Sequence, residues 1–510
     1  MELIKRRIFF WSLVAVFFVV APGVVLYAHG YRFNLKRGVF VHSGSITIKS
    51  NPQSVDIKLN DELNSSKTLN RINSSYNLNG LIPGSYAIDI SSPDFQSWDK
   101  KWDVHSGLST EFWNVLLVRK NYIRTDYPAI GVDSFYISPK NDLVAYSKKT
   151  DTGLNVSLLN ISQKTVDKSF DMPGWNFISE ARRENIEWSP DQNYISIPVK
   201  RDIAVVDDSK KEKTTKGIAA EPANRQETQY QYFVADIANN SSFNLNDFLG
   251  KNDIKDVRWD PKEKGYIFFM EGDILYRANV ADKKDIAAVV PDASAYDLSG
   301  SILYFIQGSN NLVFKTSLDG LSERVQITND FPEADQNISR MIVYNEKEIA
   351  FTSDRGNFYV YNHGEHDNYF RKLASGVIGS HFSNDGKKLL FWTDNEISVY
   401  FAHDWLVQPV RNENDMTNIT RYSEPIKNVQ WFKDFEHVIF NTGKYIKIIE
   451  LDSRDHRNSQ DLISTAIDNP FVIYNGSMER LFITDKPTDG DSLIQSIIFP
   501  EPTPLLGIGG

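Results

Sequence analysis

The sequence predicts an all-β protein that carries one transmembrane helix at its N-terminus. Between Tyr122 and Phe499 a short strand, a polar turn, an apolar strand and an alternating strand recur about eight times, and repeats of this length are typical of β-propellers. The segment from Ile8 to Ala28 has no charged side chain and is long enough to cross a bilayer as a helix. With 510 residues, 41% of them hydrophobic, the chain can bury the core of more than one domain.

The charge of the chain is divided unevenly. The formal net charge is −10, but residues 1–37 carry +5, which leaves −15 for the remainder. An acidic body argues against nucleic acid or anionic lipid as its partner. The chain has no cysteine, which excludes disulfides, thiolate nucleophiles and zinc sites built on cysteine.

We expect residues 8–28 to form an uncleaved transmembrane helix, between a basic cytoplasmic tail (1–7) and a juxtamembrane linker (29–43). The apolar run of 21 residues exceeds the roughly 7–15 residues usual in a signal peptide, and Leu26 and Ala28 make a poor cleavage pattern. A cleaved signal is the alternative. Basic residues flank both ends, so the positive-inside rule gives no orientation. Because the tail is far easier to retain than the rest of the chain, we expect an extracytoplasmic body on a single-pass cell membrane protein.

Residues 44–118 predict a small β-sandwich of six or seven strands. Ser45–Lys49 and Val55–Leu59 alternate in polarity around an Asn51-Pro52 turn, which is the pattern of half-buried strands. The domain resembles the PEGA domain, a surface-associated β-sandwich, although Pro52-Gln53-Ser54-Val55 replaces the naming Pro-Glu-Gly-Ala motif. The resemblance is carried by Ile46-x-Ile48-x-Ser50-x-Pro52, Val55-x-Ile57, Leu81-x-Pro83-Gly84-x-Tyr86 and Val104-x-x-Gly107.

Residues 122–499 predict the β-propeller, because short apolar strands follow turns rich in Pro, Asn, Asp and Gly. Eight blades are expected from the count of turns, with seven as the alternative, and the strand around Tyr122–Ile123 is expected to pair with the last blade. Residues 207–229 have no apolar periodicity and predict a mobile insertion, and 500–510 form a C-terminal tail. The expected middle strands are Leu143–Tyr146, Tyr194–Ile197, Tyr266–Phe269, Ile302–Phe305, Ile349–Phe351, Leu389–Trp392, Val438–Phe440 and Leu481–Ile483.

Tryptophans recur in the first strands of the repeats, at Trp188, Trp259 and Trp431. With the Ser-Pro-Asp and Ser-Asn-Asp-Gly turns, they resemble the propeller repeats of the TolB and WD-repeat families. The Trp-Asp dipeptide of a WD repeat is not regular here, which favours the TolB-like pattern. The order of anchor, sandwich and propeller resembles bacterial membrane-anchored PEGA domain-containing proteins, and this resemblance implies a cell-surface location and a binding or scaffolding role.

No catalytic or cofactor-binding motif is evident in the sequence. It has no Gly-x-Ser-x-Gly elbow, phosphate-binding Gly-rich loop or His-Glu-x-x-His pair. His363-Gly364-Glu365-His366-Asp367 and the acids Asp485, Asp489 and Asp491 have metal-binding side chains in spacings that match no known site, so we expect solvated loops and no metal. The candidate binding residues are aromatic side chains that could stack on a glycan if they are exposed, namely Trp98, Trp102, Trp392 and Trp405.

These observations predict a membrane-anchored cell-surface protein that binds or scaffolds a partner through its propeller, without catalysis or cofactor. Cell-wall glycan or an envelope protein is the expected partner. Two alternatives remain: a self-assembling structural component of the envelope, or a carbohydrate-active enzyme with carboxylates gathered around the propeller axis. Paired acids lining the central channel would favour the enzyme.

Overall fold

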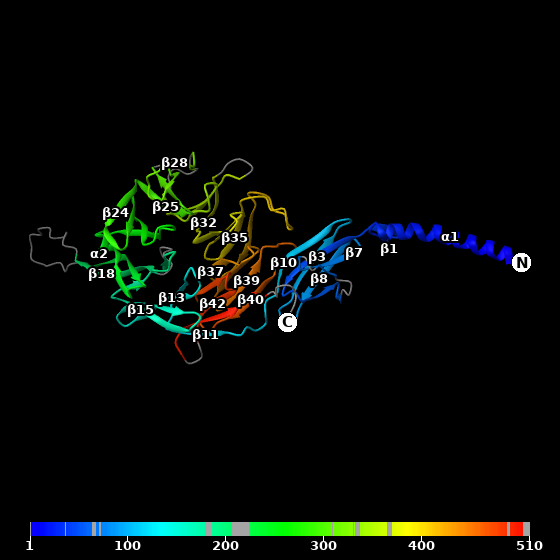
Figure 1. The fold of residues 1–510 in the computed structure, drawn as a ribbon, viewed down its shortest axis with the longest axis horizontal. Helices are drawn as coiled ribbons and strands as arrows, with labels where there is room; N and C mark the ends of the chain where they lie inside the picture. The colour runs from blue at the N-terminus through cyan, green and yellow to red at the C-terminus, as the bar shows by residue number, and fades with distance from the viewer. Residues whose placement is uncertain are drawn as a thin grey trace, which may run out of the picture.

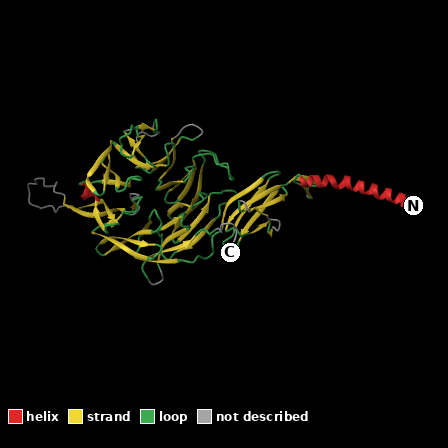
Figure 2. Cartoon of the chain, viewed as in Figure 1, coloured by secondary structure: helices red, strands yellow, loops and turns green. Residues whose placement is uncertain are grey.

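The computed structural model describes residues 2–35, 37–63, 68–70, 73–178, 185–206, 224–308, 310–329, 331, 337–364, 370–486 and 490–502. It is all-β apart from two helices, α1 (Glu2–Ala28) and the short α2 (Leu245–Leu249). The helix α1 projects from one end of the molecule, a small β domain follows it, and a ring of sheets occupies the other end (Figures 1 and 2). The chain then runs around the ring, and its last sheets return beside the small β domain (Figure 1).

The helix α1 is long and apolar enough to cross a membrane, either as a single span or as a signal sequence. Its apolar part, Ile4–Ala28, is 25 residues long, and none of the most apolar window is buried against the rest of the chain. The predicted linker after it forms an antiparallel hairpin of β1 (Tyr31–Asn34) and β2 (Val39–His42), in which Phe33 lies opposite Phe40.

The small β domain consists of two four-stranded sheets in the orders β10-β3-β7-β6 and β5-β4-β8-β9. Side chains of both sheets meet in one core, which includes Ile46 and Phe112 from the first sheet and Ile57 and Ile90 from the second. The alternating burial of β3 shows why the sequence alternates there. The strands are β3 (Gly44–Asn51), β4 (Asp56–Leu59), β5 (Glu62–Leu63), β6 (Thr68–Asn70), β7 (Ser75–Leu81), β8 (Gly84–Ser91), β9 (Trp98–Val104) and β10 (Ser109–Leu116).

The remainder of the described chain forms eight antiparallel sheets, each built mainly from strands that are consecutive in sequence. The first four sheets after β11 (Thr125–Ile130) contain β12 (Ser134–Ile137), β13 (Leu143–Thr150), β14 (Gly153–Asn160) and β15 (Thr165–Pro173); β16 (Asn176–Phe177), β17 (Glu187–Trp188), β18 (Tyr194–Val206), β19 (Asn224–Asp236) and β20 (Ser241–Asn244); β21 (Ile254–Trp259), β22 (Tyr266–Glu271), β23 (Ile274–Asn279) and β24 (Asp282–Pro291); and β25 (Ala293–Ser299), β26 (Ile302–Gln307), β27 (Leu312–Ser317) and β28 (Val325–Gln326).

The next three sheets each take four consecutive strands, and the last takes three together with β11. They contain β29 (Ile338–Val343), β30 (Glu348–Ser353), β31 (Asn357–Asn362) and β32 (Phe370–Ser375); β33 (Gly379–Phe382), β34 (Lys388–Trp392), β35 (Glu396–Phe401) and β36 (Met416–Arg421); β37 (Ile426–Trp431), β38 (His437–Thr442), β39 (Tyr445–Glu450) and β40 (Ser459–Ser464); and β41 (Val472–Asn475), β42 (Arg480–Asp485) and β43 (Leu493–Ile498).

Every predicted middle strand is present as a strand in this series, because each apolar run is buried between neighbouring sheets. The runs correspond to β13, β18, β22, β26, β30, β34, β38 and β42. The last sheet is completed by a strand from the beginning of the ring, as expected, but that strand is β11 and begins at Thr125 instead of Tyr122. Tyr122 instead packs its ring on Phe499, at 6.2 Å between centroids.

The predicted insertion 207–229 is shorter at its C-terminal side than expected. Residues 224–229 begin β19, which pairs with β18 as far as Val206 opposite Asn224. Cross-strand hydrogen bonds hold this polar extension, such as Thr228 Oγ1 to Asp202 at 2.8 Å. The sequence reasoning missed it because it relied on apolar periodicity, whereas backbone pairing needs none. Residues 207–223 lie outside the described part of the chain.

The recurring tryptophans join neighbouring sheets. Trp188 Nε1 donates to the carbonyl of Tyr136 at 3.1 Å, Trp259 Nε1 donates to that of Glu187 at 3.0 Å, and Trp431 Nε1 donates to that of His381 at 3.0 Å. Each indole is buried, and the acceptors lie in β12, β17 and β33 of the preceding sheets. A buried indole needs an acceptor for its N–H, so the repeated Trp both fills the space between sheets and fixes their spacing.

Candidate functional site

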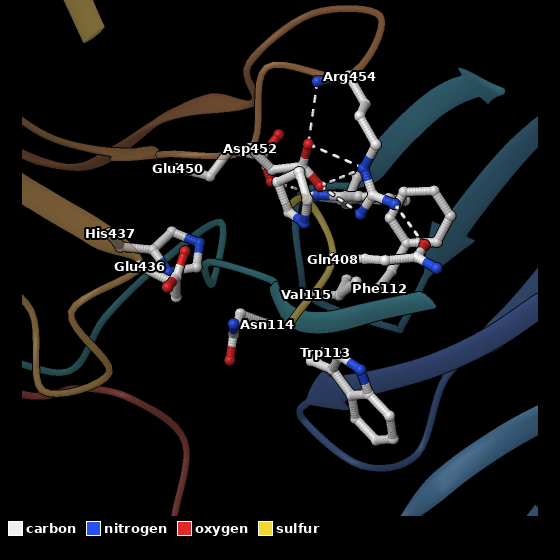
Figure 3. A pocket seen from close by; sticks show the side chains of 12 residues that line it. Phe112, Trp113, Asn114, Val115, Gln408, Glu436, His437, Glu450, Asp452 and Arg454 are labelled. Carbon is white, nitrogen blue, oxygen red and sulfur yellow. Dashed lines mark hydrogen bonds and ion pairs between the residues drawn. The ribbon is translucent and has the colours of Figure 1, made fainter. Parts of the chain in front are cut away.

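The part of the chain that the structure describes has a small hollow at the junction between the sandwich and the ring. It encloses about 20 Å³ and lies between β9 and β10 of the sandwich and the segment from Glu436 to Arg454. Figure 3 shows Arg454 reaching toward Gln408 and Phe112, with Glu436 and His437 on the opposite side. A space of this size holds about one water molecule, so the junction is a packed contact and not a ligand pocket.

The junction is organised around Lys100, whose side chain is completely buried. Its Nζ forms an ion pair with Glu450 at 2.7 Å. The same ammonium group donates to the carbonyls of Asp452 at 3.1 Å and Arg454 at 2.9 Å, and to that of His456. A buried charge is tolerated only when it is paired and its hydrogen bonds are satisfied. Lys100 of the sandwich meets this condition entirely with acceptors from the ring.

Other polar contacts extend the junction on both sides of Lys100. Trp98 Nε1 donates to Glu450 Oε2 at 2.9 Å, and Gln460 Nε2 donates to the carbonyl of Ser97 at 3.0 Å. From the ring, Arg454 donates to the carbonyl of Glu111 at 2.8 Å. These contacts come from β9 and the residue before it, at the edge of one sandwich sheet, and from β10, at the edge of the other. They therefore fix the orientation of the sandwich on the ring.

Titratable groups are packed behind the junction. His437 Nδ1 lies 2.8 Å from Asp434 Oδ2. Burial acts to lower the pKa of His437, but Asp434 outweighs it and raises the pKa above its ordinary value. Burial raises the pKa of Glu436, against the opposing effect of its ion pair with Lys388. The region therefore holds a protonated His437 against an ionised Asp434 over a wider pH range than free side chains would.

The second hollow lies at the centre of the ring and has a volume of about 740 Å³. Consecutive sheets each contribute a residue, namely Tyr136 of β12, Glu187 of β17, Arg258 of β21, Tyr296 of β25 and Arg340 of β29. A volume of this order is in the range of ligand pockets. Figure 1 shows the sheets arranged in a ring.

Arg258 links two acids in this central cavity. Its Nε lies 3.2 Å from Glu187 Oε1, and one terminal nitrogen lies 3.1 Å from Asp297 Oδ1. Burial acts to lower the pKa of Arg258, but Glu187 and Asp297 outweigh it and raise the pKa. Asp297 also accepts from the backbone N–H of Val343 at 2.7 Å. These bonds join four successive sheets, so Glu187, Arg258 and Asp297 brace the wall of the cavity.

Arg340 differs from Arg258 because its guanidinium has no hydrogen bond or ion pair with any residue that the structure describes. Its side chain is half-buried in the cavity wall. Burial, together with the positive charge of Arg258, lowers the pKa of Arg340. A guanidinium presents five N–H donors and no acceptor. Arg340 therefore lines this cavity as a cation without a hydrogen-bond partner among the described residues.

The structure does not gather the four predicted tryptophans into one surface. Trp98 was a candidate for glycan stacking only if exposed; it is 1% exposed, and its indole is held by Glu450 at the junction. Interdomain packing therefore covers its ring. Trp102 packs against the sandwich core, Trp392 packs in a core between sheets, and Trp405 lies 4.0 Å from Lys388 Nζ. These three are half-buried and remain predictions.

Two segments with metal-binding side chain types, 363–367 and the acids from Asp485 to Asp491, were expected to be solvated loops. Among the described residues, no group of three or more His, Cys, Asp or Glu side chains is placed to hold a metal ion. His363 stacks with Tyr361 at 6.4 Å between ring centroids, whereas Glu365, His366 and Asp367 lie outside the described residues. Asp485 forms an ion pair with Arg124, and Asp489 is likewise outside the described part.

The charged residues of the central cavity were missed by the sequence reasoning, although a signal was present. Glu187 and Arg258 immediately precede Trp188 and Trp259, and Asp297 precedes Leu298 at the equivalent place in β25. In an alternating strand, the neighbour of a buried residue faces the other way. Aligning the repeats on their first-strand tryptophans would have placed these charges together at the ring centre.

The strand pairing defines the chain as an all-β protein in which repeated four-stranded sheets surround a central cavity, as in a β-propeller. No protein-family model matches the sequence, and no curated protein matches it. Solved structures similar to it include the Dos1 propeller, at 11% identity and a TM-score of 0.47 over 74% of this chain and 96% of that one.

Two further similar structures have lower TM-scores. A eukaryotic initiation factor shows 12% identity and a TM-score of 0.42 over 76% of this chain and 92% of that one. The β-propeller domain of Cps50 (Swd1) from Myceliophteria thermophila shows 9% identity and a TM-score of 0.38 over 74% of this chain and 100% of that one. The fold assignment therefore rests on the strand pairing of this chain itself.

Proposed function

We propose that this protein is a membrane-anchored binding or scaffolding protein without catalytic activity, whose partner places an acidic group in the central cavity. The observation that carries the proposal is Arg340, a half-buried cation without a hydrogen-bond partner among the described residues, in a cavity of about 740 Å³. An anion bound there would satisfy guanidinium donors and offset the burial of the charge. A cell-wall polymer or an envelope protein is the partner that we propose.

The architecture supports the same proposal. We further propose that the eight sheets are blades of a propeller, that the sandwich is PEGA-like, and that α1 anchors both on the outer side of a bacterial cell membrane. Three acids line the cavity, namely Glu187, Asp256 and Asp354. Binding is proposed over catalysis because Glu187, the acid nearest to Arg258, is tied to that guanidinium. An acid–base pair for glycoside hydrolysis would need one carboxyl group free to protonate a leaving group.

The proposal is tested by photo-crosslinking of the full chain in the cells that make it. A photoreactive residue replaces the exposed Ser339, next to Arg340 in the cavity, and a matched control replaces the exposed Lys283 on β24. We expect a discrete product from position 339 but not from 283. Arg340→Met should abolish that product, while Arg340→Lys should retain part of it.

Two results would overturn the proposal. One is the same product from position 339 with and without Arg340, because the partner would then not depend on the cation. The other is no product at position 339 in cells where the protein is abundant and folded, as judged by its unfolding temperature. Turnover of cell-wall glycan by the purified chain, lost in Glu187→Gln, would instead establish an enzyme.

A further inference from the structure

The hairpin β1–β2 exposes large apolar side chains immediately after α1. Phe33, Leu35, Val39 and Phe40 are 46%, 87%, 49% and 49% exposed. Phe33 and Phe40 lie opposite each other across the two strands, with ring centroids 5.2 Å apart in an edge-to-face arrangement. A two-stranded sheet is marginally stable in water unless another layer covers it. An apolar layer over this aromatic pair would therefore stabilise the hairpin.

The hairpin is held close to the end of α1. Ser43, which follows β2, donates through its N–H and its hydroxyl to the carbonyl of Gly30 at 2.9 and 2.6 Å. Arg32 donates to the carbonyl of Tyr27 at 3.1 Å and lies 3.8 Å from the centroid of the Tyr27 ring. Figure 1 shows β1 at the end of α1, where the helix meets the sandwich. The hairpin therefore occupies the level at which the helix ends.

The sandwich continues the same apolar surface. Ser106 Oγ donates to the carbonyl of His42 at 3.1 Å, and the N–H of Gly107 donates to that of Ser43 at 3.2 Å. The next residue, Leu108, is 60% exposed. The base of the hairpin and the 106–108 turn are thus joined, with exposed apolar groups on both.

We propose that the β1–β2 hairpin lies in the interfacial layer of the membrane that α1 crosses, with Phe33 and Phe40 at the boundary of the acyl chains. The inference rests on the membrane anchor of the proposed function. About 20 helical residues span the apolar core of a bilayer, so Ala28 reaches its edge and the hairpin begins three residues later, at Tyr31. Aromatic and basic side chains are favoured at this depth.

The positive charge around the hairpin favours phospholipid as the partner of its apolar side chains. Arg32 and Arg37 flank the aromatic pair, and they belong to the N-terminal segment that carries +5 in an otherwise acidic protein. Basic residues beside a membrane are attracted to anionic headgroups. The acidic body is repelled from the same surface, so the hairpin fixes the side of the sandwich that faces the membrane.

The test uses spin labels, because a chain without cysteine accepts a single label at any chosen site. Full-length protein with Phe40→Cys is placed in nanodiscs of equal parts phosphatidylcholine and phosphatidylglycerol, and collision with oxygen and with a water-soluble nickel chelate reports depth. Val16→Cys in α1 and Lys283→Cys on β24 are the references for the acyl core and for water. We expect the Phe40 label about 5–10 Å below the headgroups.

Matched substitutions test which side chains hold the hairpin in place. With the label at Val39→Cys, the double change Phe33→Ser and Phe40→Ser should move it into water, whereas Val41→Ser should not. Replacing phosphatidylglycerol with phosphatidylcholine should raise the label toward water, because the arginines lose their anionic partners.

The controls separate failure of the inference from failure of the anchor. If the label at Phe40→Cys is in water while the label at Val16→Cys is in the acyl core, the inference is wrong and the membrane anchor still holds. Spin–spin broadening that persists in lipid-free detergent would show instead that hairpins of two copies pair. A Val16 label outside the bilayer, or absent because the segment has been cleaved, overturns the anchor and the inference together.

Discussion

The junction contains a buried cation, Lys100, whose hydrogen bonds are all satisfied. The central cavity contains a half-buried cation, Arg340, whose hydrogen bonds are not satisfied by the part of the chain that the structure describes. Lys100 has a carboxylate and three carbonyls around its ammonium group, whereas Arg340 has no hydrogen-bond partner among the described residues. Complete satisfaction makes a cation a structural element, and incomplete satisfaction leaves binding energy for a ligand. The difference separates the part of the molecule that holds its shape from the part that is available for recognition.

The largest expected effect is on the junction. Lys100→Met should destabilise the protein by about 3–5 kcal/mol, because Glu450 is left buried without its charge partner. The effect is measured by urea unfolding of the full chain in detergent. Lys101→Met is the control, since Lys101 is exposed on the same strand, and it should change stability by less than about 0.5 kcal/mol. Equal effects of the two substitutions would show that the buried pair does not hold the domains.

A smaller loss of stability is expected when the braced part of the cavity is broken. Arg258→Met removes the partner of Glu187 and of the buried Asp297, and leaving such a group unsatisfied costs about 1–3 kcal/mol. The lower value is favoured because the Arg258 side chain is 45% exposed to the cavity. Arg258→Lys should recover part of the loss. Full stability in Arg258→Met would mean that the acids are held by other contacts.

The junction should also respond to pH through His437. Its pKa is raised in the folded protein, so between about pH 6.5, the ordinary value, and the folded pKa the native state binds more protons than the unfolded state. Stability should therefore fall as the pH rises through this range, by at most about 1.4 kcal/mol per pH unit. His437→Gln should remove this slope, whereas His363→Gln, at an exposed position, should keep it.

The smallest effect on stability is expected at the residue proposed to bind. Arg340→Met should change the free energy of unfolding by no more than about 0.5 kcal/mol, because the substitution breaks no hydrogen bond or ion pair with a described residue. The same variant should lose the crosslink at position 339. A loss of stability comparable to that of Arg258→Met would show that Arg340 has the same structural role as Arg258. The distinction between a structural and a ligand-binding cation would then be wrong.

The repeated strands of the ring could be predicted because their signals are local. An apolar run such as Leu143–Tyr146, placed after the turn Ser138-Pro139-Lys140-Asn141, contains both the burial and the turn chemistry of its hairpin. The hairpin β1–β2 was treated as a linker, although Tyr31 and Phe33 alternate, because its strands have only four residues each and no buried face.

The junction could not be predicted from one sequence. Lys100 and Glu450 are 350 residues apart in a chain with many lysines and glutamates, and nothing local marks them as partners. The burial of Trp98 could not be established from sequence for the same reason, since its exposure depends on a distant segment that packs over it. The charged residues of the cavity were partly predictable. Their common position in the repeats can be read from the sequence, but their pairing with one another depends on how the ring curves.

The pairing of β11 with β43 has a consequence for the time during which the protein is made. Gln495 donates to Asp126 at 2.8 Å across 369 residues of chain. At a synthesis rate of about 5–20 residues per second, β11 emerges roughly 20–75 seconds before its partner. An unpaired strand edge invites aggregation, and proline and charge within the strand discourage it. β11 contains both features, at Asp126 and Pro128, so we expect them to limit such pairing while the ring is still open.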